Sequence, residues 1–371
     1  MKTLVLGGYG NFGARIGRAL AQDVGIDLIV GGRDLDRATA FAQSLGGAAR
    51  GLRIDVQSAD LARAIRDAGA ELVIHTAGPF QGQDYRVPHA AAAAGAHYID
   101  LADGRRFVCD FPEALDATFR TAGRAAVSGA STVPALSSAV VDHLTQGWKD
   151  IRGIDLCIAP AQGAPRGEAT LAGVLAYCGA PIRVWQDGRW VERLGWARPT
   201  KVTFARMTPR RGALCDIPDL ELFPSRYAGV QSVVFRAAFE VGLTQQAFAC
   251  LAFLRRVGLL AAPQRLAPLL QATGGLFDAF GTALGGMVVR VEGIDAQGAS
   301  ARRAWHIAAD DNHGPEIPCM AAILLARRLV RGDASWVGAH ACAGLLALSE
   351  FATEFARWGM VTDEVDEGHS P

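Results

Sequence analysis

The fold is decided by Thr3-Leu4-Val5-Leu6-Gly7-Gly8-Tyr9-Gly10-Asn11-Phe12-Gly13, an apolar run that ends in closely spaced glycines. The apolar run predicts a short buried strand, and the glycines predict a turn that leads into a helix from about residue 14 to 21. Gly8, Gly10 and Gly13 have the G-x-G-x-x-G spacing typical of dinucleotide-binding turns. In such a turn the first glycine permits the tight bend, the second lets the backbone approach a pyrophosphate, and the third lets helix and strand pack closely. The N-terminus of the helix would direct its free N–H groups at the phosphates.

A second apolar strand at 26–30 ends in Gly31-Gly32-Arg33-Asp34. The residue about 20 positions after the glycine turn distinguishes two cofactors, because an acid accepts from the ribose 2′-OH of NAD and an arginine pairs with the 2′-phosphate of NADP. Arg33 occupies this place, and its planar guanidinium can bind a phosphate through two hydrogen bonds. The spacing therefore favours NADP(H). The alternative is a solvated Arg33, with Asp34 binding the ribose.

Strands and helices alternate regularly along the first part of the chain. Helices are predicted at 38–45, 59–68 and 87–94, and further strands at 52–56, 71–76, 97–101 and 125–128. This alternation is typical of a parallel sheet with right-handed crossovers. The predicted fold class is α/β, with a Rossmann doubly wound parallel sheet.

Ligands of an open parallel sheet lie beyond the carboxyl ends of its strands. Asp55 closes the third strand, where its carboxylate either accepts from an adenine amino group or caps a turn. Gly78 follows the fourth strand and is placed to let the backbone approach a nicotinamide ribose, while Pro79 stiffens the turn. The predicted cofactor-binding residues are Gly8, Gly10, Asn11, Phe12, Gly13, Arg33, Asp55, Ala77, Gly78 and Pro79.

Three residues are predicted as catalytic proton donors or orienting groups. Tyr98 and Asp100 lie on the fifth strand, at the edge of the sheet where the cofactor is expected. His313 lies in a loop rich in acidic residues, where a neighbouring carboxylate could hold the imidazole protonated near neutrality. The alternatives are that Tyr98 is packed with its hydroxyl hydrogen-bonded, that Asp100 caps the next segment, and that His313 is an exposed loop residue.

The pattern changes near residue 149, after which strands predominate. Strands are predicted at 154–159, 183–185, 190–193, 201–206, 232–239, 287–292 and 301–308, with an apolar helical region between 243 and 280. This order predicts a second domain of α+β class with a mixed sheet. The expected domains are a Rossmann domain over 1–135, the α+β domain over 136–310, and a C-terminal part over 311–371. Helices at 320–330 and 340–355 in that part are expected to return to the Rossmann domain, and an acidic tail from Asp363 to Pro371 is expected to be disordered.

Composition favours a protein that acts on small molecules. The 371 residues have a formal net charge of zero, which provides no electrostatic attraction for nucleic acid or an anionic membrane. The seven cysteines include no C-x-x-C pair and predict reduced core residues of a cytoplasmic protein. The eight histidines show no metal-ligand spacing, so no metal is expected. The longest apolar stretch, 246–262, is interrupted by Arg255 and Arg256 and predicts a buried amphipathic helix, not a membrane span.

Five features together resemble the saccharopine dehydrogenase-like superfamily of oxidoreductases. They are the Gly7–Gly13 turn, Gly32-Arg33, the AGPF sequence at Ala77–Phe80, the A-x-A-G-x-H-Y-x-D run that ends at Asp100, and the mixed-sheet domain. The resemblance is best over the Rossmann domain. It implies NADPH as the cofactor, hydride transfer in a cleft between two domains, and substrate and dimer contacts from the second domain, so a homodimer is expected. It supports Gly8, Gly10, Gly13, Arg33 and Gly78 as cofactor contacts.

These inferences predict an NADPH-dependent oxidoreductase that reduces a C=N or C=O bond, with an activated C=C bond as a less favoured acceptor. The Tyr-x-x-x-Lys pair of short-chain dehydrogenases, the P-loop and the Gly-x-Ser-x-Gly elbow are absent from the sequence. A polycarboxylate such as saccharopine needs a cluster of cations, and the second domain contains Arg166, Arg206, Arg210, Arg211 and Arg226. The aromatic segments around these arginines favour a more apolar substrate. The alternative function is a redox sensor or scaffold that binds NADP(H) without turnover.

Overall fold

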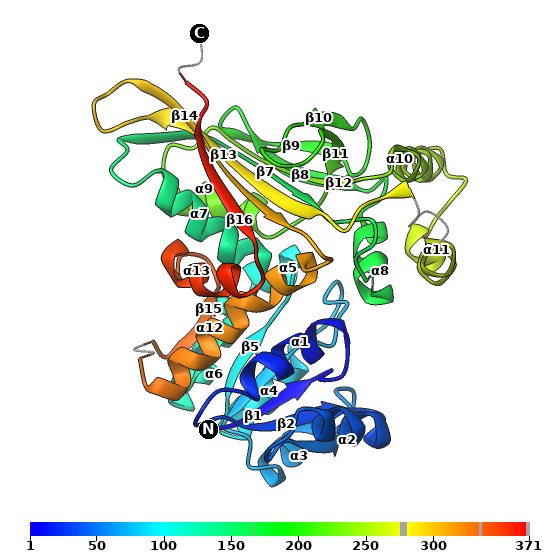
Figure 1. Ribbon diagram of the computed structural model, residues 1–371, viewed down its shortest axis with the longest axis vertical. Coiled ribbons are helices and arrows are strands. Elements are labelled where there is room, and N and C mark those ends of the chain that lie inside the picture. The colour runs from blue at the N-terminus through cyan, green and yellow to red at the C-terminus, as the bar shows by residue number, and fades with distance from the viewer. Residues whose placement is uncertain (166, 275–279, 334–335, 369–371) are drawn as a thin grey trace. The chain divides into compact units, whose positions relative to one another are not determined.

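The computed structural model describes residues 1–165, 167–274, 280–333 and 336–368, which form two compact units (Figure 1). Unit 1 comprises Met1–Ala135 and Glu316–Cys342, and unit 2 comprises Leu136–Pro315 and Ala343–Pro371. The domain boundaries after residues 135 and 310 stay a prediction. Only part of the C-terminal region belongs with the N-terminal segment, because the chain enters unit 2 again at Ala343.

Unit 1 is built on a seven-stranded sheet in which every neighbouring pair of strands is parallel. Its strands, in spatial order, are β15 (Gly338–Ala341), β6 (Ala125–Ser128), β5 (His97–Asp100), β4 (Leu72–His75), β1 (Lys2–Leu6), β2 (Asp27–Gly32) and β3 (Arg50–Arg53). From β1 the order runs to β2 and β3 on one side and to β4, β5 and β6 on the other. The prediction of a doubly wound parallel sheet is therefore confirmed. Strand order reverses between β1 and β4, which is where such sheets bind their ligands.

Helices cover this sheet and bury its central strand. They are α1 (Asn11–Leu20), α2 (Leu35–Ser44), α3 (Leu61–Asp67), α4 (Arg86–Ala93), α5 (Arg105–Cys109), α6 (Phe111–Thr121) and α12 (Ile317–Arg331), and a π-helical turn follows β6 at Thr132–Leu136. α1 packs against α12, and α3 packs against α4, which also contacts α6. Leu4, Val5 and Leu6 have no exposed surface, so the apolar run near the N-terminus reflects a strand that is buried on both faces.

The helix predicted over 340–355 is wrong in its first part. Residues Gly338–Ala341 form β15, which pairs with β6, and α13 (Leu348–Arg357) begins only later. β15 exists because its backbone completes a parallel ladder with a strand that is remote in the sequence. Local periodicity carries no information about that pairing.

Unit 2 contains a mixed nine-stranded sheet. Its main path runs β10 (Thr200–Val202), β11 (Arg210–Leu214), β12 (Ser232–Phe239), β7 (Asp150–Ala159), β13 (Gly285–Ile294), β14 (Ser300–Ala309) and β16 (Val361–Asp366), and the hairpin of β8 (Pro181–Gln186) and β9 (Arg189–Leu194) joins β12. β12 and β7 pair in parallel, whereas the other pairs are antiparallel. The predicted mixed sheet is confirmed. The prediction of a disordered tail is wrong for residues 363–366, because they belong to β16, which pairs with β14. Residues 369–371 lie outside the described residues.

The remaining helices belong to unit 2. They are α7 (Ser137–Leu144), α8 (Glu168–Ala176), α9 (Asp219–Arg226), α10 (Gly242–Arg256), α11 (Ala267–Gly274) and α13, with 3-10 turns at Pro263–Leu266 and Gly314–Glu316. α8 and α11 pack against each other and against the 3-10 turn at Pro263–Leu266. α7 contacts β13 and β14, and α10 contacts β11 and β12. The amphipathic helix predicted over 246–262 is present as α10 but ends at Arg256. Its predicted burial is wrong for one side, because Phe253 is 60% exposed, and Leu259 beyond its end is 76% exposed. No helix in the described part of the chain is long and apolar enough to cross a membrane.

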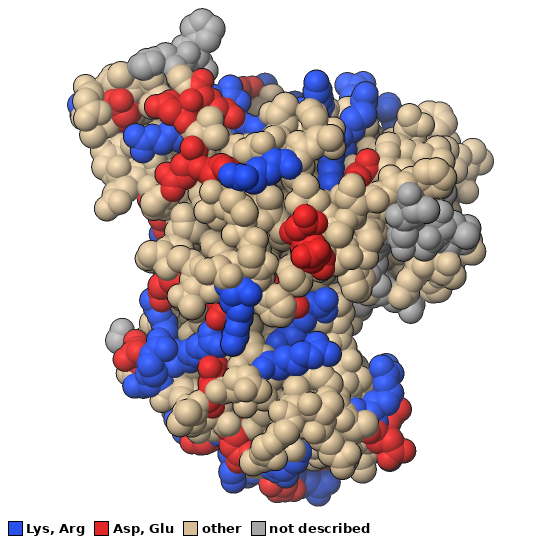
Figure 2. Space-filling view, in the orientation of Figure 1, with Lys and Arg blue, Asp and Glu red and all other residues tan. Residues whose placement is uncertain are grey.

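Charge and cysteines are distributed over both units. Figure 2 shows basic and acidic side chains interspersed over the visible face, in agreement with the net charge of zero. All seven cysteines are free, and five of them are buried as predicted. Cys250 is exposed and Cys109 is half-buried, which corrects the prediction that every cysteine lies in the core.

Candidate functional site

The glycine turn of unit 1 is too tight to accept side chains. Gly7, at the end of β1, has a φ of +75°, so the left-handed residue of the turn is Gly7 and not Gly8. The Gly8 amide donates to Gly31 O at 3.0 Å and thereby ties the turn to β2. A Cβ at Gly13 would lie 2.3 Å from Gly7 O and 2.8 Å from Thr76 Oγ1. The predicted close packing of helix and strand at Gly13 is therefore present.

The N-terminus of α1 is an uncapped group of backbone donors. The first intrahelical bond runs from Ala14 N to Gly10 O, and no side chain caps the helix at Gly10. The amides of the first turn therefore lack intrahelical partners, and the helix dipole adds partial positive charge. Asn11, Phe12 and Gly13 form this turn, which is suited to an anion such as a pyrophosphate.

Two residues that the sequence analysis missed hold the start of α1 in place. Arg15 Nη1 donates to the main-chain oxygen of Asn11 at 2.7 Å and to its side-chain oxygen at 2.6 Å. Arg15 Nε also pairs with Glu316 Oε1 at 2.9 Å, at the start of α12. The i, i+4 spacing of Asn11 and Arg15 is visible in the sequence, but the contact with Glu316 depends on the fold.

Arg33 lies directly after β2 and is exposed. Within the described residues its guanidinium has neither a hydrogen bond nor an ion pair. The carboxylate of Asp34 caps α2, because its Oδ1 accepts from Arg37 N at 3.0 Å. The alternative role for Asp34 on a ribose thus competes with a cap, while the arginine is available to bind an anion.

Tyr9 and Arg37 complete the surroundings of Arg33, and neither was identified from the sequence. The Tyr9 ring packs so closely on β2 that a Cβ at Gly32 would lie 2.2 Å from it. Its hydroxyl accepts from Asp34 N at 3.1 Å, and the Arg37 guanidinium lies over the ring at 4.7 Å from the centroid. Two guanidinium groups therefore flank the end of β2 beside the glycine turn. The signal in the sequence is the second arginine of Arg33-Asp-Leu-Asp-Arg37.

Asp55 forms a turn, in agreement with one of its two predicted roles. Its Oδ1 accepts from Gln57 N at 3.0 Å, and its main-chain oxygen accepts from Ser58 N at 3.1 Å. Asp55 is exposed, so a further contact with an adenine amino group stays a prediction.

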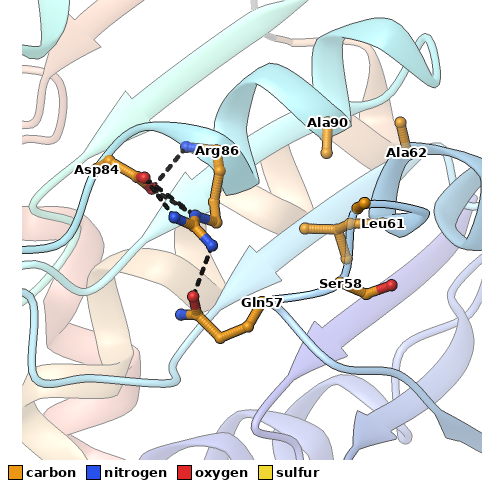
Figure 3. Close-up of a pocket in the computed structure, with 8 residues that line it drawn as sticks. Gln57, Ser58, Leu61, Ala62, Asp84, Arg86 and Ala90 are labelled. Carbon is orange, nitrogen blue, oxygen red and sulfur yellow. Dashed lines mark hydrogen bonds and ion pairs between the residues drawn. The ribbon is translucent and has the colours of Figure 1, made fainter.

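An open hollow of about 380 Å³ begins two residues after Asp55 (Figure 3). It lies between the starts of α3 and α4, and its lining includes Gln57, Leu61, Asp84, Arg86 and Ala90. Figure 3 shows the Arg86 guanidinium between the Asp84 carboxylate and the Gln57 amide oxygen, at 2.7–3.0 Å and 2.6 Å. None of the predicted cofactor residues lines this hollow, so we do not assign the dinucleotide to it.

The loop after β4 is held in place by two side chains, Thr76 and Gln83, that belong to no sequence motif. Thr76 Oγ1 donates to Leu6 O at 2.8 Å, which joins the ends of β4 and β1. Gln83 Nε2 donates to the main-chain oxygens of Ala77 at 3.0 Å and Pro79 at 2.7 Å. A Cβ at Gly78 would meet nothing closer than the Phe80 ring at 3.6 Å, so packing within the chain does not require glycine there.

Tyr98 and Asp100 have no exposed surface. The Tyr98 hydroxyl is 3.0 Å from His75 Nδ1, and its ring stacks on Phe111. Asp100 Oδ1 accepts from the amides of Ala102 and Gly129 at 2.9 and 2.8 Å, so it links the ends of β5 and β6. The two residues lie at the predicted edge, in the packed arrangement that was the alternative to a catalytic one.

Burial dominates the electrostatics of this group. It raises the pKa of Asp100 to about 6, against the opposing effect of hydrogen bonds from Gly129 and Ala102. Burial also lowers the pKa of His75 to about 4 and raises the pKa of Tyr98 well above its usual value. His75 is therefore neutral at pH 7, and the Tyr98 phenol keeps its proton.

His313 belongs to unit 2, whereas Tyr98 and Asp100 belong to unit 1. Its Nδ1 is 3.1 Å from Trp358 O, and its ring packs against the Trp358 ring with centroids 4.9 Å apart. The preceding residues Asp311 and Asn312 have φ values of +51° and +59°, which is uncommon for residues other than glycine. A catalytic role for His313 stays a prediction.

The arginines of unit 2 are occupied within that unit. Arg206 binds Asp363 through two hydrogen bonds, and Arg226 pairs with Asp142. Arg210 is 4% exposed and donates to the main-chain oxygens of Ala159, Pro160 and Leu284, and Arg211 donates to Pro199 O. Each of these four arginines thus has a partner, and Arg166, the fifth arginine considered for a polycarboxylate, lies outside the described residues.

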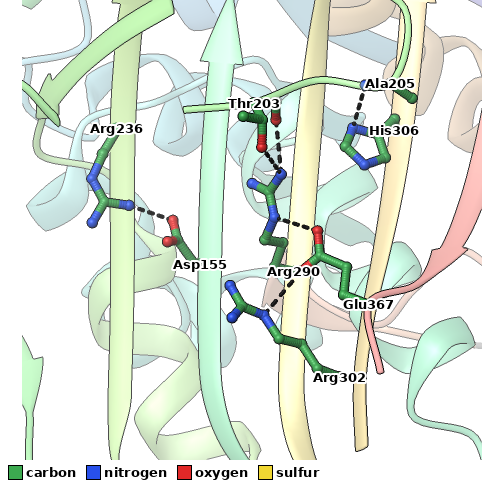
Figure 4. A network of polar contacts seen from close by, with 8 residues as sticks. All are labelled: Asp155, Thr203, Ala205, Arg236, Arg290, Arg302, His306 and Glu367. Atoms are coloured by element: carbon green, nitrogen blue, oxygen red, sulfur yellow. Dashed lines mark hydrogen bonds and ion pairs between the residues drawn. The ribbon is translucent and has the colours of Figure 1, made fainter. Parts of the chain in front are cut away.

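The face of the mixed sheet shows the same pairing of charges (Figure 4). Arg290 donates to Glu367 at 2.9 Å and to the main-chain oxygen of Thr203 at 2.8 Å, and Arg302 pairs with the second oxygen of Glu367. Arg236 donates to Asp155 across β12 and β7. These contacts join neighbouring segments of the sheet through charged side chains. The described residues also contain no group of three His, Cys, Asp or Glu side chains that could hold a metal ion.

Comparison with known proteins agrees with this geometry. Residues 3–133 match the saccharopine dehydrogenase NADP binding domain family. The whole chain is similar in structure to apo saccharopine dehydrogenase (L-Glu forming) from Saccharomyces cerevisiae, with a TM-score of 0.69, 12% identity, and coverage of 99% of this chain and 100% of that one. It is also similar to homospermidine synthase from Legionella pneumophila in complex with NAD, with a TM-score of 0.60, 10% identity, and coverage of 98% and 91%. No curated protein matches the sequence.

These matches confirm the resemblance that the glycine turn and the AGPF sequence indicated. The domain match supports a nicotinamide dinucleotide as the cofactor. The likeness to the two solved structures shows the fold alone, because sequence identity is low. Three features of unit 1 fit a dinucleotide independently of these matches. They are the closed glycine turn, the uncapped start of α1 and the unpaired Arg33.

Proposed function

We propose that the chain, whose residues 3–133 match the saccharopine dehydrogenase NADP binding domain family, is an NADPH-dependent reductase of a C=N or C=O bond. When bound, NADPH supplies the hydride. The residues of unit 1 bind and orient the dinucleotide: the amides of the first turn of α1 take the pyrophosphate, and the exposed guanidinium of Arg33 takes the 2′-phosphate.

The observation that carries the preference for NADPH is the unpaired Arg33 beside the glycine turn. A guanidinium that has no partner in its own chain retains its hydrogen-bonding capacity for a phosphate. Arg37 adds a second positive charge, held over the Tyr9 ring. We include Arg37 and Tyr9 in the proposed site, together with Gly8, Gly10, Asn11, Phe12, Gly13, Arg33, Asp55, Ala77, Gly78 and Pro79.

The substrate proposed is small and more apolar than saccharopine. This proposal is supported by the pairing of Arg206, Arg210, Arg211 and Arg226 within unit 2, because each guanidinium already binds an oxygen of its own chain. For the proton that follows the hydride, His313 is retained as a candidate because it is half-buried and near the surface. For Tyr98 and Asp100 we propose a structural role, in which they hold the carboxyl edge of the parallel sheet in place, because neither residue has exposed surface.

That burial is also the observation that favours a second candidate function. A dinucleotide-binding unit whose polar groups at the carboxyl edge are enclosed could bind NADP(H) as a redox sensor or scaffold without turnover. The two functions differ in a direct experiment. Incubation of the purified protein with NADPH and a panel of imines, ketones and enoyl esters is expected to give loss of absorbance at 340 nm for an imine or a ketone. Binding of NADPH, seen by its fluorescence, without loss of absorbance over the panel would favour the sensor.

A further inference from the structure

The outer face of α10 is apolar and exposed. Leu243, Phe253 and Val257 are 58%, 60% and 49% exposed, and Cys250 is exposed with them. Steps of seven, three and four residues separate these positions, so they lie along one side of the helix. The opposite side packs into unit 2 through Gln245, Phe248 and Ala252. α10 thus has two apolar faces, only one of which is covered by its own chain.

The exposed surface continues beyond the end of α10. Leu259 follows Gly258, which has a φ of +79°, and is 76% exposed at this turn. Leu269 on α11 is 60% exposed. Contiguous exposed apolar patches on monomeric proteins mark interaction surfaces. We call Leu243, Cys250, Phe253, Val257 and Leu259 the α10 face.

The segment that carries the α10 face has charges of one sign. Between Glu240 and Asp278 the sequence contains no acidic residue, and its only charged residues are Arg255, Arg256 and Arg265. Arg255 donates to the main-chain oxygens at 176 and 178, whereas Arg256 and Arg265 are exposed. In Figure 2 the visible surface over α10 and α11 is tan, apart from residues drawn in grey.

We propose that the α10 face binds the surface of an anionic lipid bilayer. The apolar side chains would enter the boundary between headgroups and acyl chains, and Arg256 and Arg265 would pair with lipid phosphates. α10 has 15 residues and packs along one side on unit 2, so it lies on the bilayer and does not cross it. A second copy of this chain fits this face less well. A two-fold interface would bring the α10 faces of both copies together, so Arg256 and Arg265 of one copy would lie near the same arginines of the other, and the segment has no acidic residue to neutralise them.

The test is flotation of the full-length protein with two kinds of vesicle. One kind is phosphatidylcholine alone, and the other contains phosphatidylglycerol in addition. The wild-type protein is expected to float with the anionic vesicles and to be released as salt is raised. Phe253→Ser combined with Leu259→Ser is expected to reduce binding roughly tenfold or more. Arg256→Gln combined with Arg265→Gln is expected to reduce binding roughly thirtyfold on anionic vesicles only.

Val24→Ser is the matched control, because Val24 is a fully exposed apolar residue of unit 1. It is expected to leave flotation unchanged. NADPH binding and the thermal midpoint, measured for every variant, separate loss of docking from loss of folding. Absence of flotation with both vesicles, or equal flotation of the wild type and the Phe253 and Leu259 variant, overturns the proposal. A concentration-dependent dimer that this variant abolishes, without flotation, also overturns it and assigns the face to a second copy.

Discussion

Replacement of Arg33 by alanine tests the proposed basis of cofactor preference. Arg33 is exposed and has no partner within the described residues, so its removal breaks no contact in the folded chain. Stability should therefore stay within about 0.5 kcal/mol of the wild type. If the guanidinium binds the 2′-phosphate, the variant loses one charged hydrogen-bonding interaction. Such an interaction corresponds to a rise of roughly 10- to 150-fold in the Kd for NADPH.

NADH lacks the 2′-phosphate, so its affinity for Arg33→Ala should be nearly unchanged. Isothermal titration calorimetry with both nucleotides at one ionic strength measures the two changes directly. Arg189→Ala removes the same charge from an exposed position on the hairpin of unit 2 and is expected to change neither affinity. An equal loss for NADPH and NADH in Arg33→Ala, or a loss as large in Arg189→Ala, would refute the assignment of Arg33 to the 2′-phosphate.

Three further predictions concern the turn and two buried groups. Gly13→Ala places a Cβ 2.3 Å from Gly7 O, so the variant should lose about 1–3 kcal/mol of stability and should no longer bind NADPH. An unchanged Kd for NADPH, measured by calorimetry, would contradict the role of the turn. Tyr98→Phe removes the hydroxyl that contacts His75 Nδ1, so the free energy of unfolding in urea should fall by about 1–3 kcal/mol. The kcat of the folded variant should be unchanged, and a large drop in kcat would restore Tyr98 as a proton donor. Burial raises the pKa of Asp219 to about 7, so the folded state favours the protonated acid and stability falls as pH rises from about 4 to about 7. Asp219→Asn should remove that part of the pH dependence, and identical urea midpoints against pH for both proteins would disprove it.

The dinucleotide-binding half of the fold was predictable because its determinants are local. The bend after β1 needs a left-handed residue, and the close approach of α1 needs a residue without a side chain. Both constraints leave glycines at defined spacings. Arg33 is separated from the glycine turn by one helix, α1, and one strand, β2. Its position could therefore be found by counting residues from the turn. Tyr9 and Arg37 were missed because the G-x-G-x-x-G motif leaves the residue at Tyr9 unspecified and does not extend to Arg37.

The sequence left open whether the candidate catalytic residues Tyr98 and Asp100 are buried. Tyr98 and Asp100 occupy the expected edge, yet whether a polar group there faces solvent depends on Phe111 and on the loop after β6. The net charge of zero also concealed a segment without acidic residues, and the exposure of its apolar side chains became visible only in the packed structure. A composition averaged over the chain does not describe one face of it.

The sequence by itself determined the parallel sheet, the glycine turn and the arginine beside it, because backbone conformation and spacing along the chain are properties of neighbouring residues. The tertiary structure decided which polar groups are enclosed, that residues 338–341 and 361–366 are strands, and that α10 presents a second apolar face. Each of these depends on contacts between segments remote in the sequence, since strand pairing and burial are set by the partners that a segment finds in space.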